Sequence, residues 1–196
     1  MKKITFIKST LVYLTFGFST LFIVSCSNDQ KPEDTKAVAE DHNDAKFDNK
    51  KNEKDAQFLV NAAEINSEEI SLGQLAQKSG RTSHVKELGK MMEDAHTKSM
   101  ADLNALAKSK IISLPTSQTD KEKATYKKLN DKSGNDFDKA YADLMVDGHK
   151  DAITLFERAS TESIDLDVRA WATSSLPALR HHLDEAIICQ KKCSKK

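Results

Sequence analysis

Apolar residues recur every three or four positions in four long stretches of the chain, which is the spacing of one face of an α-helix. The stretches cover about residues 54–78, 82–110, 135–161 and 165–188. Their face positions include Phe58, Leu72, Leu75, Val85, Leu88, Met92, Leu103, Tyr141, Met145, Phe156, Ala172, Leu176, Leu179 and Leu183. No strand-like alternation of useful length competes with this pattern, so the chain is predicted to be all-α.

The connections between the four stretches predict how the helices pair. Gly80 ends the first stretch, and the third and fourth stretches are also separated by only a few residues, so both connections are tight turns. Residues 111–134 form a much longer connection that contains a short polar helical piece. Two helical hairpins joined by one long crossover predict a ferritin-like antiparallel four-helix bundle over residues 54–190. The crossover lies between its second and third helices.

The first 25 residues are predicted to be a signal peptide. A short basic start precedes an apolar run from Leu11 to Val24, which is too short to cross a bilayer comfortably. The sequence Ile23-Val24-Ser25-Cys26 resembles a bacterial lipoprotein signal, in which the cysteine becomes the lipidated first residue of the mature chain. This resemblance implies that Cys26 carries acyl chains such as palmitate. The alternative is an ordinary signal peptide followed by a chance cysteine.

The segment after Cys26 is predicted to be a disordered tether. Residues 26–53 are rich in Asp, Asn, Lys and Glu and poor in aromatic residues, so they bury too little apolar surface to offset the entropy of ordering. Two or more acyl chains hold a protein stably on a membrane. The expected arrangement is a bundle anchored in the cell envelope, on the periplasmic or surface face of the outer membrane. Residues 191–196 are expected to form a basic tail.

Composition and motifs exclude several classes of function. Charged residues make up 31% of the chain, with a formal net charge of zero, and no basic stripe with interleaved aromatic residues is present. Nucleic-acid binding is therefore not predicted. The sequence also contains no phosphate-binding loop, zinc-protease motif or recognisable nucleophile–base pair, which favours a non-enzymatic module. No protein partner is indicated.

Four motifs resemble a known bacterial family. They are EISLGQLAQKSG at residues 69–80, VKELGKMMEDAHTK at 85–98, FDKAYADLMVDGHKDAITLFERA at 137–159 and LPALRHHL at 176–183. They are similar to the domain of unknown function 4142 family, often labelled an outer-membrane protein. The resemblance implies an exported ferritin-like bundle but no activity, because the family is itself uncharacterised. This chain has Ala95 and Gly148 where members commonly carry an acidic residue, and Asp94 and Asp147 lie one position earlier.

One polar group from each predicted helix falls at a similar height in the bundle. Glu69 and His96 lie about 12 and 15 residues from the first turn, and His149 and His182 lie about 16 and 17 residues from the last. Because a helix rises about 1.5 Å per residue, these heights differ by only a few ångströms. Glu69 and His149 lie within the apolar faces of their helices, whereas His96 and His182 lie at the edges of theirs.

These four residues, Glu69, His96, His149 and His182, are the candidate metal site. Three imidazoles and one carboxylate form a ligand set suited to zinc, copper or iron. The alternative is a structural layer, in which the glutamate and the histidines hydrogen-bond across helices and fix their register.

A redox enzyme or metal store of the ferritin-like class is a competing hypothesis. Di-iron proteins of this class use a glutamate on each of two helices and Glu-x-x-His on the other two. The chain offers that motif once, as Glu93-x-x-His96, because Leu179 stands three residues before His182. A structural or partner-binding role in envelope stress or adhesion is a further alternative.

Cys189 and Cys193 lie four residues apart near the C-terminus. Helix neighbours at this spacing do not match relaxed disulfide geometry, although a frayed helix end would allow the bond in an oxidising compartment. A metal bound by the two cysteines and a nearby histidine is the other hypothesis for this pair.

Overall fold

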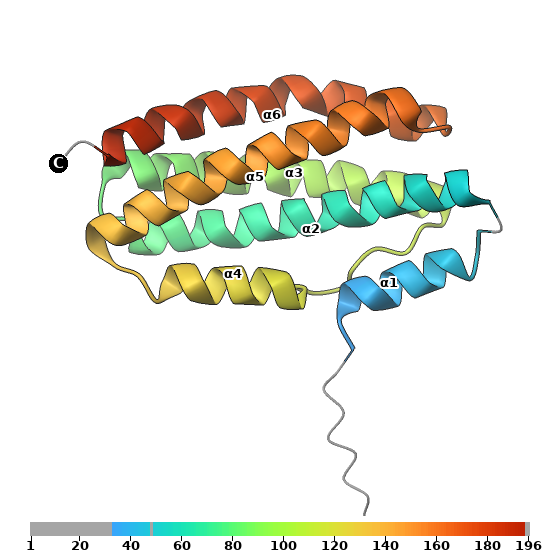
Figure 1. The fold of residues 1–196 in the computed structure, drawn as a ribbon, viewed down its shortest axis with the longest axis horizontal. Coiled ribbons are helices and arrows are strands. Elements are labelled where there is room, and N and C mark those ends of the chain that lie inside the picture. The colour runs from blue at the N-terminus through green and yellow to red at the C-terminus, as the bar shows by residue number, and fades with distance from the viewer. Residues whose placement is uncertain (1–32, 48, 195–196) are drawn as a thin grey trace, which may run out of the picture. The chain divides into compact units, whose positions relative to one another are not determined.

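Six helices and no strand make up the described part of the chain. A computed structural model describes residues 33–47 and 49–194 of the 196 residues. In chain order the helices are α1 (Thr35–Asp44), α2 (Lys50–Ser79), α3 (Ser83–Lys110), α4 (Asp120–Asn130), α5 (Gly134–Glu162) and α6 (Leu166–Cys193) (Figure 1). The prediction of an all-α protein is confirmed. Within these residues, no helix is long and apolar enough to cross a membrane.

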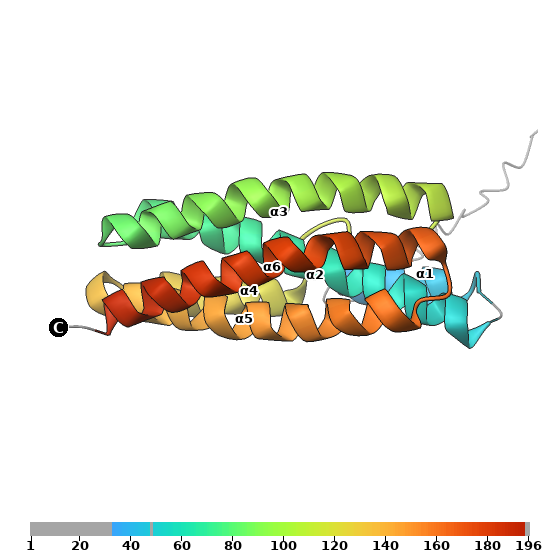
Figure 2. The same ribbon diagram turned by 90° about the horizontal axis from the view of Figure 1, so that it is seen from above.

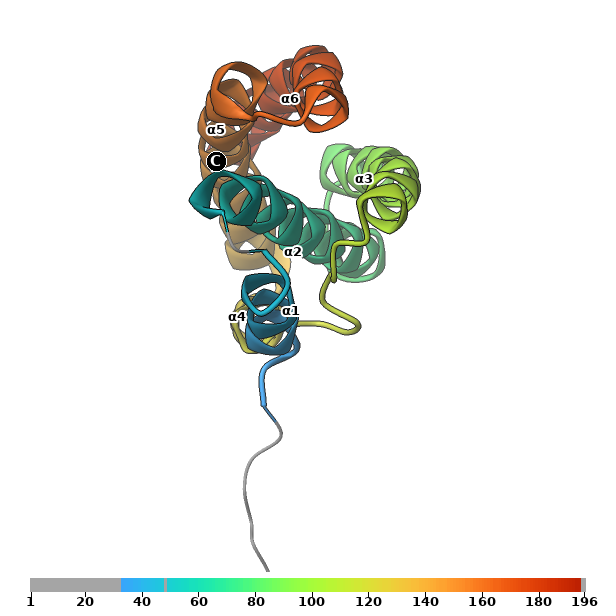
Figure 3. The same ribbon diagram turned by 90° about the vertical axis from the view of Figure 1, so that its right-hand side faces the viewer.

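The four long helices form two antiparallel hairpins that pack against each other (Figures 1 and 2). α2 pairs with α3 and α5 pairs with α6, each through a three-residue loop. α2 also contacts α5, and α3 contacts α6, which joins the hairpins into one helical bundle. The long connection from α3 to α5 contains α4. Both α4 and α1 pack on the side of α2 that faces away from α6 (Figure 3).

Two buried aspartates hold the hairpin loops in place. The Asp138 carboxylate on α5 accepts hydrogen bonds from the backbone N–H groups of Arg81 and Thr82 in the α2–α3 loop, at 2.8 and 3.0 Å. The Asp55 carboxylate on α2 accepts from the backbone N–H groups of Ile164 and Asp165 in the α5–α6 loop, at 3.1 and 2.9 Å. Each aspartate therefore satisfies backbone donors near a helix start in the opposite hairpin and sets the register between the hairpins.

Gly73 and Gly89 allow the backbones of α2 and α3 to touch. A Cβ atom added at Gly73 would lie 2.6 Å from the carbonyl oxygen of Gly89, and one added at Gly89 would lie 2.7 Å from the carbonyl oxygen of Gly73. Any larger side chain would have to push the helices apart, because the opposing atoms belong to rigid helical backbone. This contact fixes the spacing of the α2–α3 hairpin about one turn from Glu69.

The apolar core is divided into two clusters by a polar layer. The cluster toward the α2–α3 loop includes Leu72, Leu75, Val85, Met92, Phe137, Tyr141, Met145 and Ala186, and the cluster toward the α5–α6 loop includes Phe58, Leu59, Leu103, Ala152, Phe156, Ala172, Leu176 and Leu179. Between the clusters, the buried side chains of all four long helices are polar: Glu64, Asn66 and Glu69 on α2, His96 on α3, His149 on α5 and His182 on α6. Apart from Glu64, which faces α1, these residues form the polar layer.

The structure differs from the sequence prediction in the segment expected to be a disordered tether. Residues 35–44 form α1, which docks on α2 through an ion pair of 2.8 Å between Lys36 Nζ and Glu64 Oε2. At the other end of α1, the Asn43 side chain exchanges two hydrogen bonds with the backbone of Ser113, at 2.9 and 2.8 Å. The prediction from composition missed α1 because the contacts between this helix and the rest of the protein are largely polar. Ala39 is its buried apolar residue.

The predicted boundaries near the two ends of the chain have different outcomes. α6 continues through Cys193, so the expected basic tail from residue 191 is helical for its first three residues. The predicted signal peptide, Cys26 and the first part of the predicted tether lie outside the described residues.

Candidate functional site

Three imidazoles from three different helices meet in the polar layer. The ring centroids of His96, His149 and His182 lie 5.4–5.6 Å apart in all three pairings. One ligand atom from each histidine lies within 4.8 Å of the ligand atoms of the other two. Their exposed fractions are 3%, 1% and 7%, so the group is shielded from bulk water. The structure thus brings together three of the four residues that the sequence indicated.

Hydrogen bonds on the outer side of two rings orient them inward. His149 Nδ1 lies 2.8 Å from the backbone carbonyl oxygen of Met145, which can only accept, so the proton is on Nδ1 and the lone pair is on Nε2. His96 Nδ1 lies 2.8 Å from Asn66 Oδ1, which imposes the same tautomer. Such partners orient the histidine ligands of metal sites in proteins.

Each of the three histidines also has one ring nitrogen that is buried without a partner within the described chain. His96 Nε2, His149 Nε2 and His182 Nδ1 have no hydrogen-bond acceptor or donor among the residues that the structure describes. A buried polar atom left unsatisfied costs about 1–3 kcal/mol. Each histidine of the group has one such nitrogen, and a bound ion or molecule that contacts it would offset the cost.

Burial keeps the three rings neutral. Burial, followed by the neighbouring imidazoles His149 and His182, lowers the pKa of His96 well below its ordinary value. Burial also lowers the pKa of His149, against the hydrogen bond to Met145, and lowers the pKa of His182 to about 4. At neutral pH each ring therefore has an unprotonated nitrogen, which is the form that binds a metal.

Glu69 lies beside this group rather than within it. Its Oε1 atom is 3.8 Å from His149 Nδ1, the nitrogen that is bonded to Met145, and its Oε2 atom has no partner among the described residues. Burial raises the pKa of Glu69 to about 8, with Glu68 adding to the shift, so the carboxyl group is largely protonated at neutral pH. Gly148 leaves room for it, since a Cβ there would lie 3.3 Å from Oε1.

The carboxylates of Glu93, Asp94 and Asp147 have partners outside the three-histidine group. The Glu93 carboxylate accepts hydrogen bonds from Gln74 and Gln77, at 2.8 and 2.6 Å, near the protein surface. Asp94 and Asp147 are exposed and pair with lysines on their own helices. The Glu-x-x-His motif therefore contributes its histidine but not its glutamate, and a di-iron carboxylate site is not assembled by these residues.

A pocket of about 270 Å³ opens beside the imidazoles. It lies between α2, α3 and α6, and its wall includes Asn66, His96, Ser99, Trp171, Leu179 and His182. Two of the three histidines line it, so the pocket extends up to the edge of the group.

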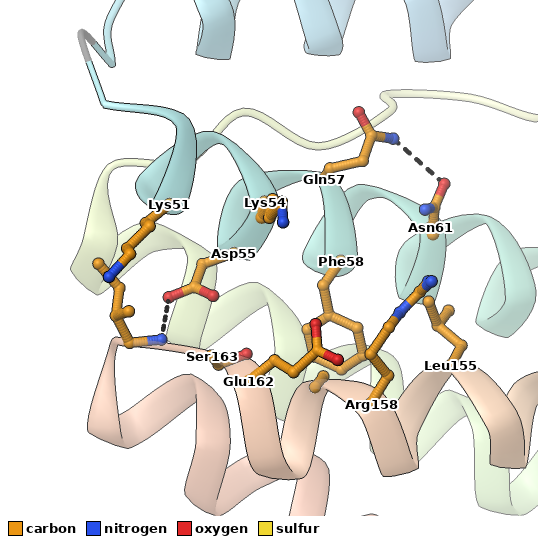
Figure 4. Close-up of a pocket in the computed structure, with 12 residues that line it drawn as sticks. Lys51, Lys54, Asp55, Gln57, Phe58, Asn61, Leu155, Arg158, Glu162 and Ser163 are labelled. Atoms are coloured by element: carbon orange, nitrogen blue, oxygen red, sulfur yellow. Dashed lines mark hydrogen bonds between the residues drawn. The ribbon is translucent and has the colours of Figure 1, made fainter.

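A larger pocket, of about 370 Å³, lies between the start of α2 and the end of α5 (Figure 4). Charged residues that line it include Lys51, Lys54, Arg158 and Glu162. The Asp55 carboxylate in its wall is already engaged by the α5–α6 loop. None of its lining residues carries a buried polar atom without a partner within the described chain, so this pocket lacks the chemistry of the polar layer.

Comparison with known families gives one match. Residues 40–187 match the family model described as "Domain of unknown function (DUF4142)". The chain belongs to the DUF4142 family. No curated protein and no solved structure matches it significantly. The family resemblance recognised from the four motifs is therefore confirmed. The match begins inside α1, which agrees with that helix being part of the folded unit in this DUF4142 protein.

Sequence reasoning missed two residues of these clusters, Asn66 and His84. Asn66, which orients His96, lies three residues before Glu69 on the same face of α2, so its helical spacing could have revealed it. His84 lies close to Cys189 and Cys193, and no local pattern connects these residues because they come from different hairpins.

Proposed function

We propose that this DUF4142 protein binds one transition-metal ion through His96, His149 and His182, with Glu69 beside the ligands. Two observations carry the proposal: the three histidines bring ligand atoms within 4.8 Å of one another, and each has a buried ring nitrogen with no partner within the described chain. A purely structural layer would be expected to pair these atoms with one another or with Glu69, because unpaired buried groups destabilise the fold.

The spacing of the rings supports a single ion. Nitrogen ligands about 2.0–2.1 Å from a tetrahedral zinc lie about 3.4 Å apart. The ligand atoms of the three histidines lie within 4.8 Å of one another, so they would have to approach one another by at most about 1.4 Å to bind one ion. Neutral imidazoles suit zinc, copper and iron, and the pocket beside His96 and His182 would admit a water or small ligand to the remaining position.

We also propose that the site lies in a ferritin-like bundle and that a lipid anchor holds this bundle at a membrane. The arrangement of α2, α3, α5 and α6, with one long crossover, supports a ferritin-like four-helix bundle. The sequence around Cys26 supports a lipid anchor that holds this bundle in the cell envelope. Replacing Cys26 with serine should release the protein from the membrane fraction and abolish palmitate incorporation.

Metal analysis tests the binding proposal. The full chain, purified without chelators and then titrated with Zn²⁺, should bind one equivalent at the imidazoles. His149→Ala should lose that equivalent, whereas His181→Ala should keep it, because His181 is exposed on the same helix as His182 and outside the group. Equal metal content in all three proteins would overturn the proposal. Two equivalents of bound iron would favour a redox enzyme or metal store instead.

A further inference from the structure

A second cluster of metal-binding side chains lies at the end of the bundle where α3 begins and α6 ends, on the left in Figures 1 and 2. His84 Nε2 is 3.8 Å from Cys193 Sγ, and Cys193 Sγ is 4.0 Å from Cys189 Sγ. All three ligand atoms lie within 4.8 Å of one another. The thiols are free, and the cluster shares no residue with the three-histidine group.

Two helices supply these ligands: α6 carries both cysteines and α3 carries His84. Cys189 and Cys193 lie on the same face of α6 because they are four residues apart, and Cys189 packs into the apolar cluster at this end of the bundle. His84 comes from the first turn of α3. The start of that helix is fixed because Thr82 donates its hydroxyl proton to Asp138, at 2.7 Å. Among the residues that the structure describes, the other contact of His84 Nε2 is with Thr82 Oγ1, at 3.3 Å.

The distances fit a metal ion better than a disulfide. Bonds of about 2.3 Å to sulfur and about 2.0 Å to nitrogen place two ligands of a tetrahedral ion about 3.5–3.8 Å apart. The observed separations of 3.8 and 4.0 Å are within a few tenths of an ångström of that spacing. A disulfide needs sulfur atoms about 2.05 Å apart, which would require distortion of α6, a helix that is continuous through Cys193.

We propose that His84, Cys189 and Cys193 form a second site, which binds a soft metal ion, Cu⁺ or Zn²⁺. Thiolate sulfur selects these ions over hard cations such as Mg²⁺ or Ca²⁺. Binding forms two metal–sulfur bonds and one metal–nitrogen bond, and the two thiol protons pass to solvent. No fourth side chain joins the group among the described residues, which suits three-coordinate Cu⁺ or a Zn²⁺ ion that keeps one water.

Cobalt provides a probe that reports on sulfur ligands. The full chain, reduced and kept under anaerobic conditions, should develop thiolate-to-cobalt charge-transfer absorption on titration with Co²⁺, and Zn²⁺ or Cu⁺ should abolish it by displacement. The double variant Cys189→Ser/Cys193→Ser should lack this absorption. His84→Ala should weaken Co²⁺ binding at least about tenfold, because even groups that only support a ligand contribute that much to metal affinity.

Controls separate this site from the three-histidine group. His149→Ala should keep the full charge-transfer absorption even though it removes a ligand of the other site, and circular dichroism should show that each variant remains helical. Absence of charge-transfer absorption in the reduced wild-type chain, with both thiols still reactive toward a thiol reagent, would overturn the proposal. A Cys189–Cys193 disulfide found by mass spectrometry in protein isolated from cells would overturn it as well.

Discussion

Replacing His149 with leucine distinguishes a metal site from a structural polar layer. His149 is 1% exposed, and its Nε2 atom is buried without a partner within the described chain. Leucine has a similar size and carries no polar atom, so the variant removes the cost of that unsatisfied nitrogen, about 1–3 kcal/mol. It also removes the hydrogen bond from Nδ1 to the carbonyl of Met145, which is worth about 1 kcal/mol.

The expected net effect depends on metal. Met145 is one turn before His149 inside α5, so its carbonyl oxygen keeps its helical backbone partner after the substitution. In a chelator the variant should therefore be as stable as the wild type, or up to about 2 kcal/mol more stable. With Zn²⁺ at about 100 times its dissociation constant, the wild type should gain about 3 kcal/mol. The variant lacks the three-histidine site and should gain about 3 kcal/mol less than the wild type, whatever Zn²⁺ contributes at His84, Cys189 and Cys193, so the order of stabilities should reverse.

Denaturant unfolding, followed by circular dichroism, measures both conditions. His181→Leu is the matched control, because this exposed neighbour of His182 should change the free energy of unfolding by no more than about 0.5 kcal/mol in either condition. If His149→Leu instead loses more than about 2 kcal/mol in chelator, and loses the same amount in Zn²⁺, the imidazole stabilises the fold by itself and the reasoning from unpaired nitrogens is refuted.

Three further predictions test the framework that positions the site. Asp138→Ala should lower the free energy of unfolding by about 3 kcal/mol in urea denaturation, because the backbone N–H groups of the α2–α3 loop lose their acceptor. An unchanged urea midpoint would contradict this role. Gly89→Ala should lower the free energy of unfolding by about 1–3 kcal/mol by the same measurement, because its Cβ would meet the Gly73 carbonyl. Gly148→Ala is the control and should cost much less, because its Cβ would meet only a side chain; equal effects would contradict the backbone contact. Burial raises the pKa of Glu122 from 4.5 to about 7, so the folded state binds the carboxyl proton more tightly than the unfolded state does. The stability that this protonation contributes is fully present below pH 4.5 and is lost as the pH rises through 7. Between those values the wild type should lose on the order of 3 kcal/mol more than Glu122→Gln, and parallel stability–pH curves would disprove the shift.

The heights of the polar residues could be predicted from the sequence because they follow from local geometry. Helical periodicity located the long helices, and a constant rise per residue placed Glu69, His96, His149 and His182 at similar levels. The rotation of each helix about its own axis could not be predicted, because it depends on how neighbouring helices pack. Packing turned His96 and His182 inward from the edges of their apolar faces and left Glu69, which was better centred, beside the group.

Contacts between distant segments were decided only by the tertiary structure. The docking of α1 depends on Lys36 meeting Glu64 and on Asn43 meeting Ser113, and composition cannot reveal such pairs because it counts apolar surface alone. His84 likewise reaches Cys193 only because the start of α3 and the end of α6 lie at the same end of the bundle. The sequence by itself thus determined the four long helices, their order and the presence of a polar level. The packing of the hairpins decided which side chains share a site, because only packing fixes the distances between residues that are far apart along the chain.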